Sequence, residues 1–111
     1  MDIDALRQML DRGRDSAMLR FTLGKALYDA GEHQEAEQHL GHAIDLDAGY
    51  SAAWQWLGQL LLQARRWPEA LDILQQGIVA AASAGDKQAE KVMRVLKRRA
   101  VKALTAQAEE E

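Results

Sequence analysis

The sequence predicts an all-α fold, in which helices stack as antiparallel pairs in a short array. Two stretches of 34 residues, 17–50 and 51–84, match each other along their length. Apolar residues recur three and four positions apart through most of the chain, and no segment alternates with the period of a strand. A fixed repeat of this length is typical of stacked helical units. We therefore expect one domain spanning residues 1–111.

The matching positions are those that helices use to pack. Both stretches read Leu-Gly-x-x-Leu and then Ala-x-x-x-Leu. Small residues at such positions let two helix axes approach to about 8–10 Å. The aligned pairs are Leu23 with Leu57, Gly24 with Gly58, Leu27 with Leu61, Ala30 with Ala64, Ala36 with Ala70, Leu40 with Leu74 and Ile44 with Ile78.

Three helices are expected in the first half of the chain. The first is amphipathic, with apolar residues on one face and Asp and Arg between them. The second begins where Asp15 or Ser16 can accept a free backbone N–H, and it ends before Gly31, a residue suited to the left-handed conformation. The predicted ranges are 2–12, 16–30 and 33–46.

Three more helices are expected in the second half. Ser51 is the predicted cap of the fourth helix, and Pro68 lies in the first turn of the fifth, where its missing N–H costs nothing. Gly85 and Asp86 then end the fifth helix and cap the sixth. The predicted ranges are 51–64, 67–82 and 86–108.

These units resemble the tetratricopeptide repeat, whose helix–turn–helix unit carries Trp-x-x-Leu-Gly-x-x-Tyr, then Ala-x-x-x-Phe, then Pro. The resemblance implies a right-handed α-solenoid with an N-terminal helix over 1–13, repeat one over 17–50 and repeat two over 51–84. Residues 86–108 lack the motif, and a terminal helix of this kind is expected to cap the array. Departures from the motif are Leu in place of Tyr in both repeats, Arg20 for Trp, Ala48 and Ala82 for Pro, and Arg65 for the turn glycine Gly31.

The resemblance also implies which residues pack. In this family the glycine of the first helix lies against the alanine of the second. Gly24 is therefore expected to face Ala36, and Gly58 to face Ala70. Trp54 occupies the family's tryptophan position and is expected in the core.

Members of this family bind other proteins on a concave face formed by the first helix of each repeat. The resemblance thus implies an adaptor or co-chaperone-like module that holds a partner's peptide or helix, with burial of Phe21 or Trp56 under the flanking helices as the alternative. One subfamily grips a C-terminal carboxylate with Lys and Asn. The matching positions here offer only Lys25, so that ligand class is not expected. The predicted groove residues are Met18, Phe21, Lys25, Tyr28, Gln55, Trp56 and Gln59, with Ala52 and Leu62 beside them.

The charge is segregated along the chain. Residues 87–102 carry a net charge of +6, whereas the rest of the protein is at −9. Five of the cations in this segment form a stripe along one face of the predicted helix. This stripe is most simply the solvated face of an end helix, although its charge also suits acidic partners or phosphate backbones. No aromatic residues interleave with these cations, so base stacking is not expected, and contact with nucleic acid through these cations is the most distant alternative. The basic stripe, as we call it below, comprises Lys87, Lys91, Arg94, Arg98 and Lys102.

No catalytic, cofactor or metal site is expected. The chain has no Cys, no phosphate-cradling glycine loop and no His-Glu-x-x-His motif. His39 and His42 share a helix face with Glu35, but surface histidines are commoner than metal sites, and His33 lies apart from them. No apolar run reaches the roughly 20 residues that span a bilayer, so a cytoplasmic protein is expected. The alternative to an adaptor is a structural subunit that self-associates through the ends of its short array.

Overall fold

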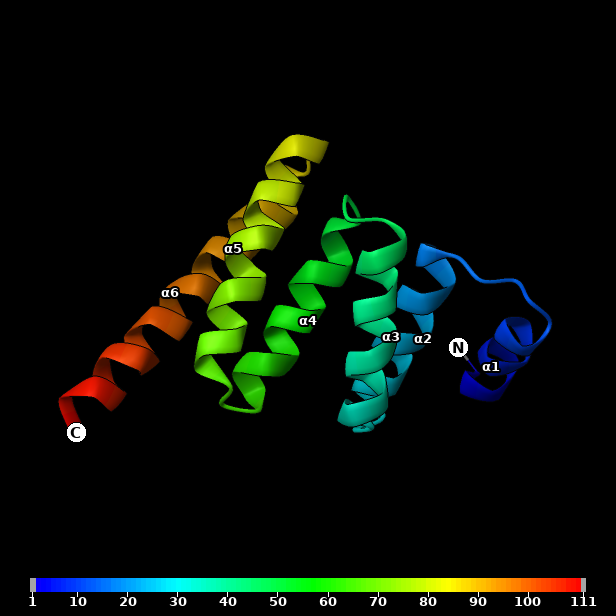
Figure 1. Ribbon diagram of the computed structural model, residues 1–111, viewed down its shortest axis with the longest axis horizontal. Coiled ribbons are helices and arrows are strands. Elements are labelled where there is room, and N and C mark those ends of the chain that lie inside the picture. Colours follow the sequence, from blue (N-terminus) through cyan, green and yellow to red (C-terminus); the bar gives the residue numbers. More distant parts are fainter. Residues whose placement is uncertain (1, 111) are drawn as a thin grey trace.

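The computed structural model describes residues 2–110, and the secondary structure found there is helical (Figure 1). Helix bounds agree with those predicted to within one or two residues, including the turns that separate the pairs. The six helices are α1 (Ile3–Asp11), α2 (Ala17–Asp29), α3 (His33–Leu46), α4 (Ser51–Gln63), α5 (Trp67–Ala84) and α6 (Lys87–Glu110).

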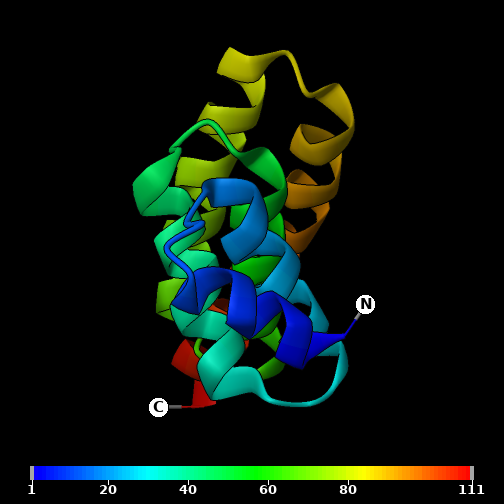
Figure 2. The same cartoon turned by 90° about the vertical axis from the view of Figure 1, so that its right-hand side faces the viewer.

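The helices form a one-dimensional array measuring 50 × 30 × 19 Å. Antiparallel pairs α2–α3 and α4–α5 stack through α3 against α4 and α2 against α4. Helix α1 packs on α2 at one end, and Figure 2 looks at the array from that end. Helix α6 packs on α5 and α4 at the other end. It therefore occupies the place of the first helix of a third unit, although its sequence lacks the motif.

Local chemistry explains where most helices begin and end. Ser16 Oγ accepts the backbone N–H of Leu19 at 3.0 Å, so Ser16 rather than Asp15 caps α2. Gly31 and Gly85 have φ values of +84° and +72°, which supply the expected left-handed stops. Arg65 replaces the turn glycine in repeat two and still adopts φ of +59°, so the turn keeps its shape with an uncommon residue.

The prediction that Ser51 caps α4 is wrong. Tyr50 takes the cap position of α4 without a side-chain hydrogen bond, while Ser51 is the first helical residue and is buried. Ser51 Oγ instead donates to Asp86 Oδ2 at 2.5 Å. The other oxygen of Asp86 accepts the N–H of Ala89 at 3.0 Å, which confirms the predicted cap of α6. The Asp86 carboxylate thus caps α6 and also links it by a hydrogen bond to the first residue of α4.

A continuous apolar core runs along the array. Trp54 is 7% exposed, as expected, and its Nε1 donates to the Ala48 carbonyl oxygen at 2.8 Å, which satisfies the indole N–H. Met93 of α6 is fully buried with the central leucines, so the last helix closes the apolar end of repeat two. The largest fully buried side chains are Leu23, Leu27, Leu40, Leu74 and Met93.

At the close helix crossings, the atoms nearest to the two glycines belong to leucines and not to the predicted alanines. A Cβ placed on Gly24 would lie 2.9 Å from Cγ of Leu40, and one on Gly58 would lie 2.8 Å from Cγ of Leu74. Each glycine therefore accommodates the leucine one turn beyond the predicted alanine, Ala36 or Ala70. A third crossing at Gly77 was not foreseen. A Cβ there would lie 2.6 Å from Sδ of Met93 and 2.7 Å from Cβ of Trp54.

Candidate functional site

The predicted groove residues lie on α2 and α4, two neighbouring helices that contact each other. Helix α1 packs on α2 but not on α4, and α6 packs on α4 but not on α2, within residues 2–110. Neither flanking helix therefore bridges the surface between α2 and α4. Arrays of this kind offer such a surface to partners.

The centre of this surface is an aromatic and cationic cluster. Tyr28 and Trp56 meet edge to face with centroids 5.5 Å apart, and Lys25 Nζ lies 4.3 Å from the Trp56 centroid. The Tyr28 hydroxyl lies 2.5 Å from Oε1 of Gln63, to which it donates a hydrogen bond. We call Lys25, Tyr28 and Trp56 the groove cluster; all three side chains are half-buried. The two rings are thus held by their neighbours and stay partly accessible.

Two contacts of the groove cluster were not predicted. Asp29 accepts from Lys25 Nζ at 2.8 Å, four residues along the same helix, a spacing that the sequence does display. His33 stacks on Tyr28 with centroids 5.2 Å apart. Lys25, the single cation among the predicted groove residues, therefore already has a carboxylate partner.

The remaining predicted groove residues fall into three environments. Met18 is 67% exposed at the start of α2. Phe21 is half-buried, and its ring lies 5.3 Å from that of Tyr50, so it helps to hold the turn before α4. The prediction for Leu62 is wrong, because Leu62 is only 7% exposed and belongs to the core. Residues with half-buried, partly accessible side chains are Ala52, Gln55 and Gln59.

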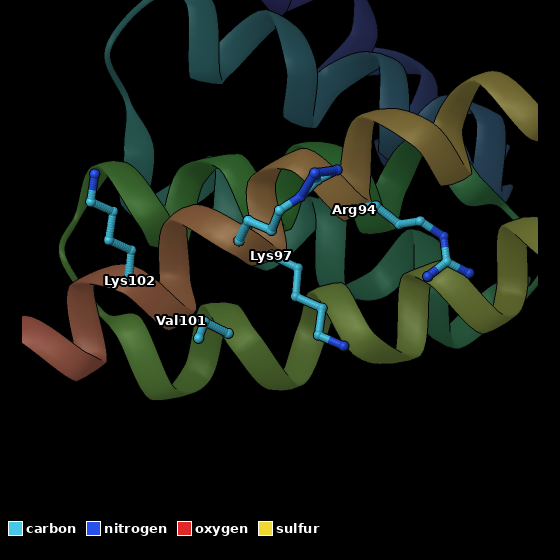
Figure 3. Close-up of a pocket in the computed structure, with 5 residues that line it drawn as sticks. Arg94, Lys97, Val101 and Lys102 are labelled. Carbon is cyan, nitrogen blue, oxygen red and sulfur yellow. The ribbon is translucent and has the colours of Figure 1, made fainter.

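The basic stripe lies on the solvent side of α6. Arg94, Arg98 and Lys102 surround a shallow hollow of about 410 Å³ together with Lys97 and Val101, whereas Lys87 and Lys91 do not line it (Figure 3). Arg94 is paired with Glu90, four residues earlier, at 2.8 Å. The opposite face of α6 buries Ala89, Met93, Leu96 and Ala100. The helix thus caps the array on one face and is cationic on the other.

An ionic network joins α1, α2 and α3. Arg7 Nη2 donates to Glu35 Oε1 at 2.6 Å, and Arg20 Nε donates to Asp15 Oδ1 at 2.8 Å. His39 lies between the two pairs, with Nδ1 3.1 Å from Arg20 Nη1 and Nε2 3.4 Å from Glu35 Oε2. The Arg7 hydrogen bond lowers the pKa of Glu35, and the Arg20 hydrogen bond lowers that of Asp15. Burial lowers the pKa of His39 and favours the neutral ring.

The histidines and carboxylates do not gather around a common point. His39 and His42 have ring centroids 6.5 Å apart, and Glu35 is occupied by Arg7 and His39. Within residues 2–110, no group of three or more His, Asp or Glu side chains is placed to hold a metal ion. Over the same residues, no helix has both the length and the apolar character needed to cross a membrane.

Comparison with known proteins decides the family. The model of the family described as "Tetratricopeptide repeat" matches residues 27–92, from the last turn of α2 into α6. The TPR repeat-containing protein PA0015 of Pseudomonas aeruginosa is 43% identical over 105 residues, which are 95% of this chain and all of that protein. The chain belongs to the tetratricopeptide repeat (TPR) family. The match to PA0015 covers 95% of the chain, so the relationship extends beyond the two repeats.

Solved TPR structures share the arrangement. The solution structure of protein BPP2914 from Bordetella parapertussis is similar to this chain with a TM-score of 0.78 and 37% identity, covering 92% of this chain and 89% of that one. The TPR2B domain of yeast Sti1, solved as a complex with pHsp70, has a TM-score of 0.83 at 18% identity and covers 90% and 80% of the two chains. The TPR fold suggests a protein–protein interaction module.

Proposed function

We propose that this TPR protein acts as an adaptor that binds a peptide or helix of a partner protein on the surface between α2 and α4. The observation that carries the proposal is the groove cluster, in which Trp56 and Tyr28 are braced by neighbours yet remain partly accessible. Aromatic side chains held in this way are typical anchors of protein interfaces, because they bury a large area at little cost in side-chain entropy.

The polar surroundings support the same proposal. Gln55 and Gln59 lie one turn apart on α4, beside Trp56, and amides can donate to and accept from a peptide backbone. Lys25 is shared between Asp29 and the Trp56 ring, so the surface carries little free charge. An apolar or weakly charged segment fits this surface better than an acidic carboxyl terminus. The proposed role is binding and not catalysis, as is typical of the TPR family.

The complex of the yeast Sti1 domain with pHsp70 supports the choice of a peptide-sized ligand, because a domain of this fold has been solved with a protein-derived partner.

A peptide-display selection on the intact protein, followed by titration of the selected peptides, tests this proposal. The groove variant Lys25→Ala/Gln55→Ala/Gln59→Ala should weaken binding at least about tenfold, which is the loss of roughly 1.4 kcal/mol. Phe21 is left unchanged because it packs on Tyr50. The matched control Gln75→Ala/Gln76→Ala alters exposed amides on α5 and should bind as the wild type does. Equal binding by the groove variant would refute the proposal.

A further inference from the structure

The hollow on α6 combines cationic side chains with an exposed apolar one, and the capping role of the helix requires neither. Lys97, Arg98 and Lys102 surround Val101, which is 43% exposed, and Figure 3 shows Lys97 and Lys102 extending on opposite sides of the helix. Among the described residues, salt bridges link Arg94 to Glu90 but reach none of these three cations. Here an exposed apolar side chain is surrounded by cations that have no acidic partner within residues 2–110. Such a surface favours a partner that has an apolar side chain surrounded by negative charges.

The same chain carries a surface with the opposite pattern. Leu46, the last residue of α3, is 53% exposed, and exposed Asp45 and Asp47 flank it. Asp15, Arg20, His42, Asp45 and Leu46 line a shallow hollow of about 230 Å³. Asp15 is already paired with Arg20, so the exposed carboxylates outside this ion pair are Asp45, which lines the hollow, and Asp47, which follows Leu46 in the sequence. We call Asp45, Leu46 and Asp47 the acidic patch, and Lys97, Arg98, Val101 and Lys102 the basic patch.

These two patches cannot meet within one molecule. Helices α3 and α6 do not contact each other in residues 2–110, because the α4–α5 pair lies between them (Figure 1). The charge follows the same polarity, with residues 1–50 at net −5 and residues 87–111 at net +3. Any pairing of the patches therefore requires two copies.

We propose that copies of this protein associate head to tail, with the acidic patch of one molecule on the basic patch of the next. Leu46 meets Val101 at the centre of the contact, and Asp45 and Asp47 meet the cations around it. The contact joins different surfaces of two identical chains, so each molecule keeps one free patch and the assembly can grow. It leaves the α2–α4 surface uncovered, and so it is independent of the proposed function.

Solution mass against protein concentration and salt tests this association. Sedimentation equilibrium up to about 1 mM protein should show the mass rising above the 12.4 kDa monomer in about 0.01 M salt. It should return to 12.4 kDa in about 1 M salt, where the screening length falls from roughly 30 Å to 3 Å. A monomer at every concentration in low salt would overturn the proposal.

Charge reversal makes the test specific. Arg98→Glu/Lys102→Glu and Asp45→Lys/Asp47→Lys should each be monomeric alone, because each then carries two patches of one sign. Mixed in equal amounts, they should associate again. Arg12→Glu/Lys87→Glu makes the same change in net charge as the first pair outside both patches, and it should associate like the wild type. Failure of the mixture to associate, or association of either variant alone, would contradict the pairing. Low-salt binding of a twenty-nucleotide oligo(dT) lost on Arg98→Glu/Lys102→Glu, without self-association, would assign the basic patch to nucleic acid instead.

Discussion

Two glycines of this chain have opposite roles in the same kind of helix. At Gly58 a methyl group would lie 2.8 Å from Cγ of fully buried Leu74, whereas at Gly41 it would meet nothing within 4 Å. Gly58→Ala should therefore destabilise the protein by about 1–3 kcal/mol through overpacking. Gly41→Ala should stabilise it by up to about 1 kcal/mol through helix propensity. Chemical denaturation measures both, and a neutral Gly58→Ala would show that the α4–α5 crossing is not tight.

His39 makes the stability depend on pH. Burial lowers the pKa of this ring in the folded protein, with Glu35, Arg20 and His42 as its charged or titratable neighbours. As the pH falls below about 6.5, the unfolded chain takes up a proton first, so the free energy of unfolding decreases. Denaturation at pH 7.5 and at pH 5.5 should show this loss, and His39→Gln should reduce it. His42→Gln, which changes an exposed ring on the same helix and removes the smallest of the contributions to the His39 pKa, should retain most of the wild-type loss. An unchanged slope in His39→Gln would show that other groups cause it.

At the scale of the element, α6 is the part whose role the sequence predicts least directly. Its first half buries Met93 against Gly77 and Trp54, while residues 105–110 are exposed. A chain ending at Gly85 should aggregate or lose helicity, because the apolar end of repeat two would be open to water. A chain ending at Leu104 should melt within a few degrees of the full chain. Circular dichroism and light scattering compare the two, and a soluble, helical 1–85 fragment would contradict the capping role.

Helix bounds were predictable because their signals are local. Gly31, Gly85 and Asp86 determine backbone conformation within a few residues, and each behaves as expected. The prediction for Ser51 is wrong because the contact that decides its role is not local. Its hydroxyl donates a hydrogen bond to Asp86, 35 residues away, and nothing in the local sequence shows that pairing. The same limit applies at Gly77, whose neighbours Trp54 and Met93 come from two other helices.

For the groove residues too, the sequence predicts the position along the helices but not the exposure of the side chains. The repeat period placed Lys25, Tyr28 and Trp56 on the first helices of successive units, which was enough to bring them together. Their exposure depends on neighbours that the period does not specify. Tyr50 packs on Phe21, and Leu62 turns into the core although its aligned position in repeat one holds the accessible Tyr28.

At the scale of the whole molecule, the two proposals use different surfaces of one short solenoid. The groove cluster lies between α2 and α4, while the acidic and basic patches lie on α3 and α6. A partner on the first surface and copies on the second can be accommodated together. Repetition of one unit would then present several groove clusters along an assembly, which raises the effective affinity for a partner with several binding segments.

The central claim is that the α2–α4 surface is the binding site, and the tryptophan side chains report on it directly. The chain has three tryptophans, and Trp56 is the one in the groove cluster. Trp54 is buried and donates a hydrogen bond to the Ala48 carbonyl oxygen, and Trp67 is the first residue of α5. A ¹H–¹⁵N spectrum recorded during titration with a selected peptide should shift the Trp56 indole signal and leave those of Trp54 and Trp67 in place. Saturable binding in which the Trp56 signal does not move, while amides of α6 or α3 do, would contradict the account.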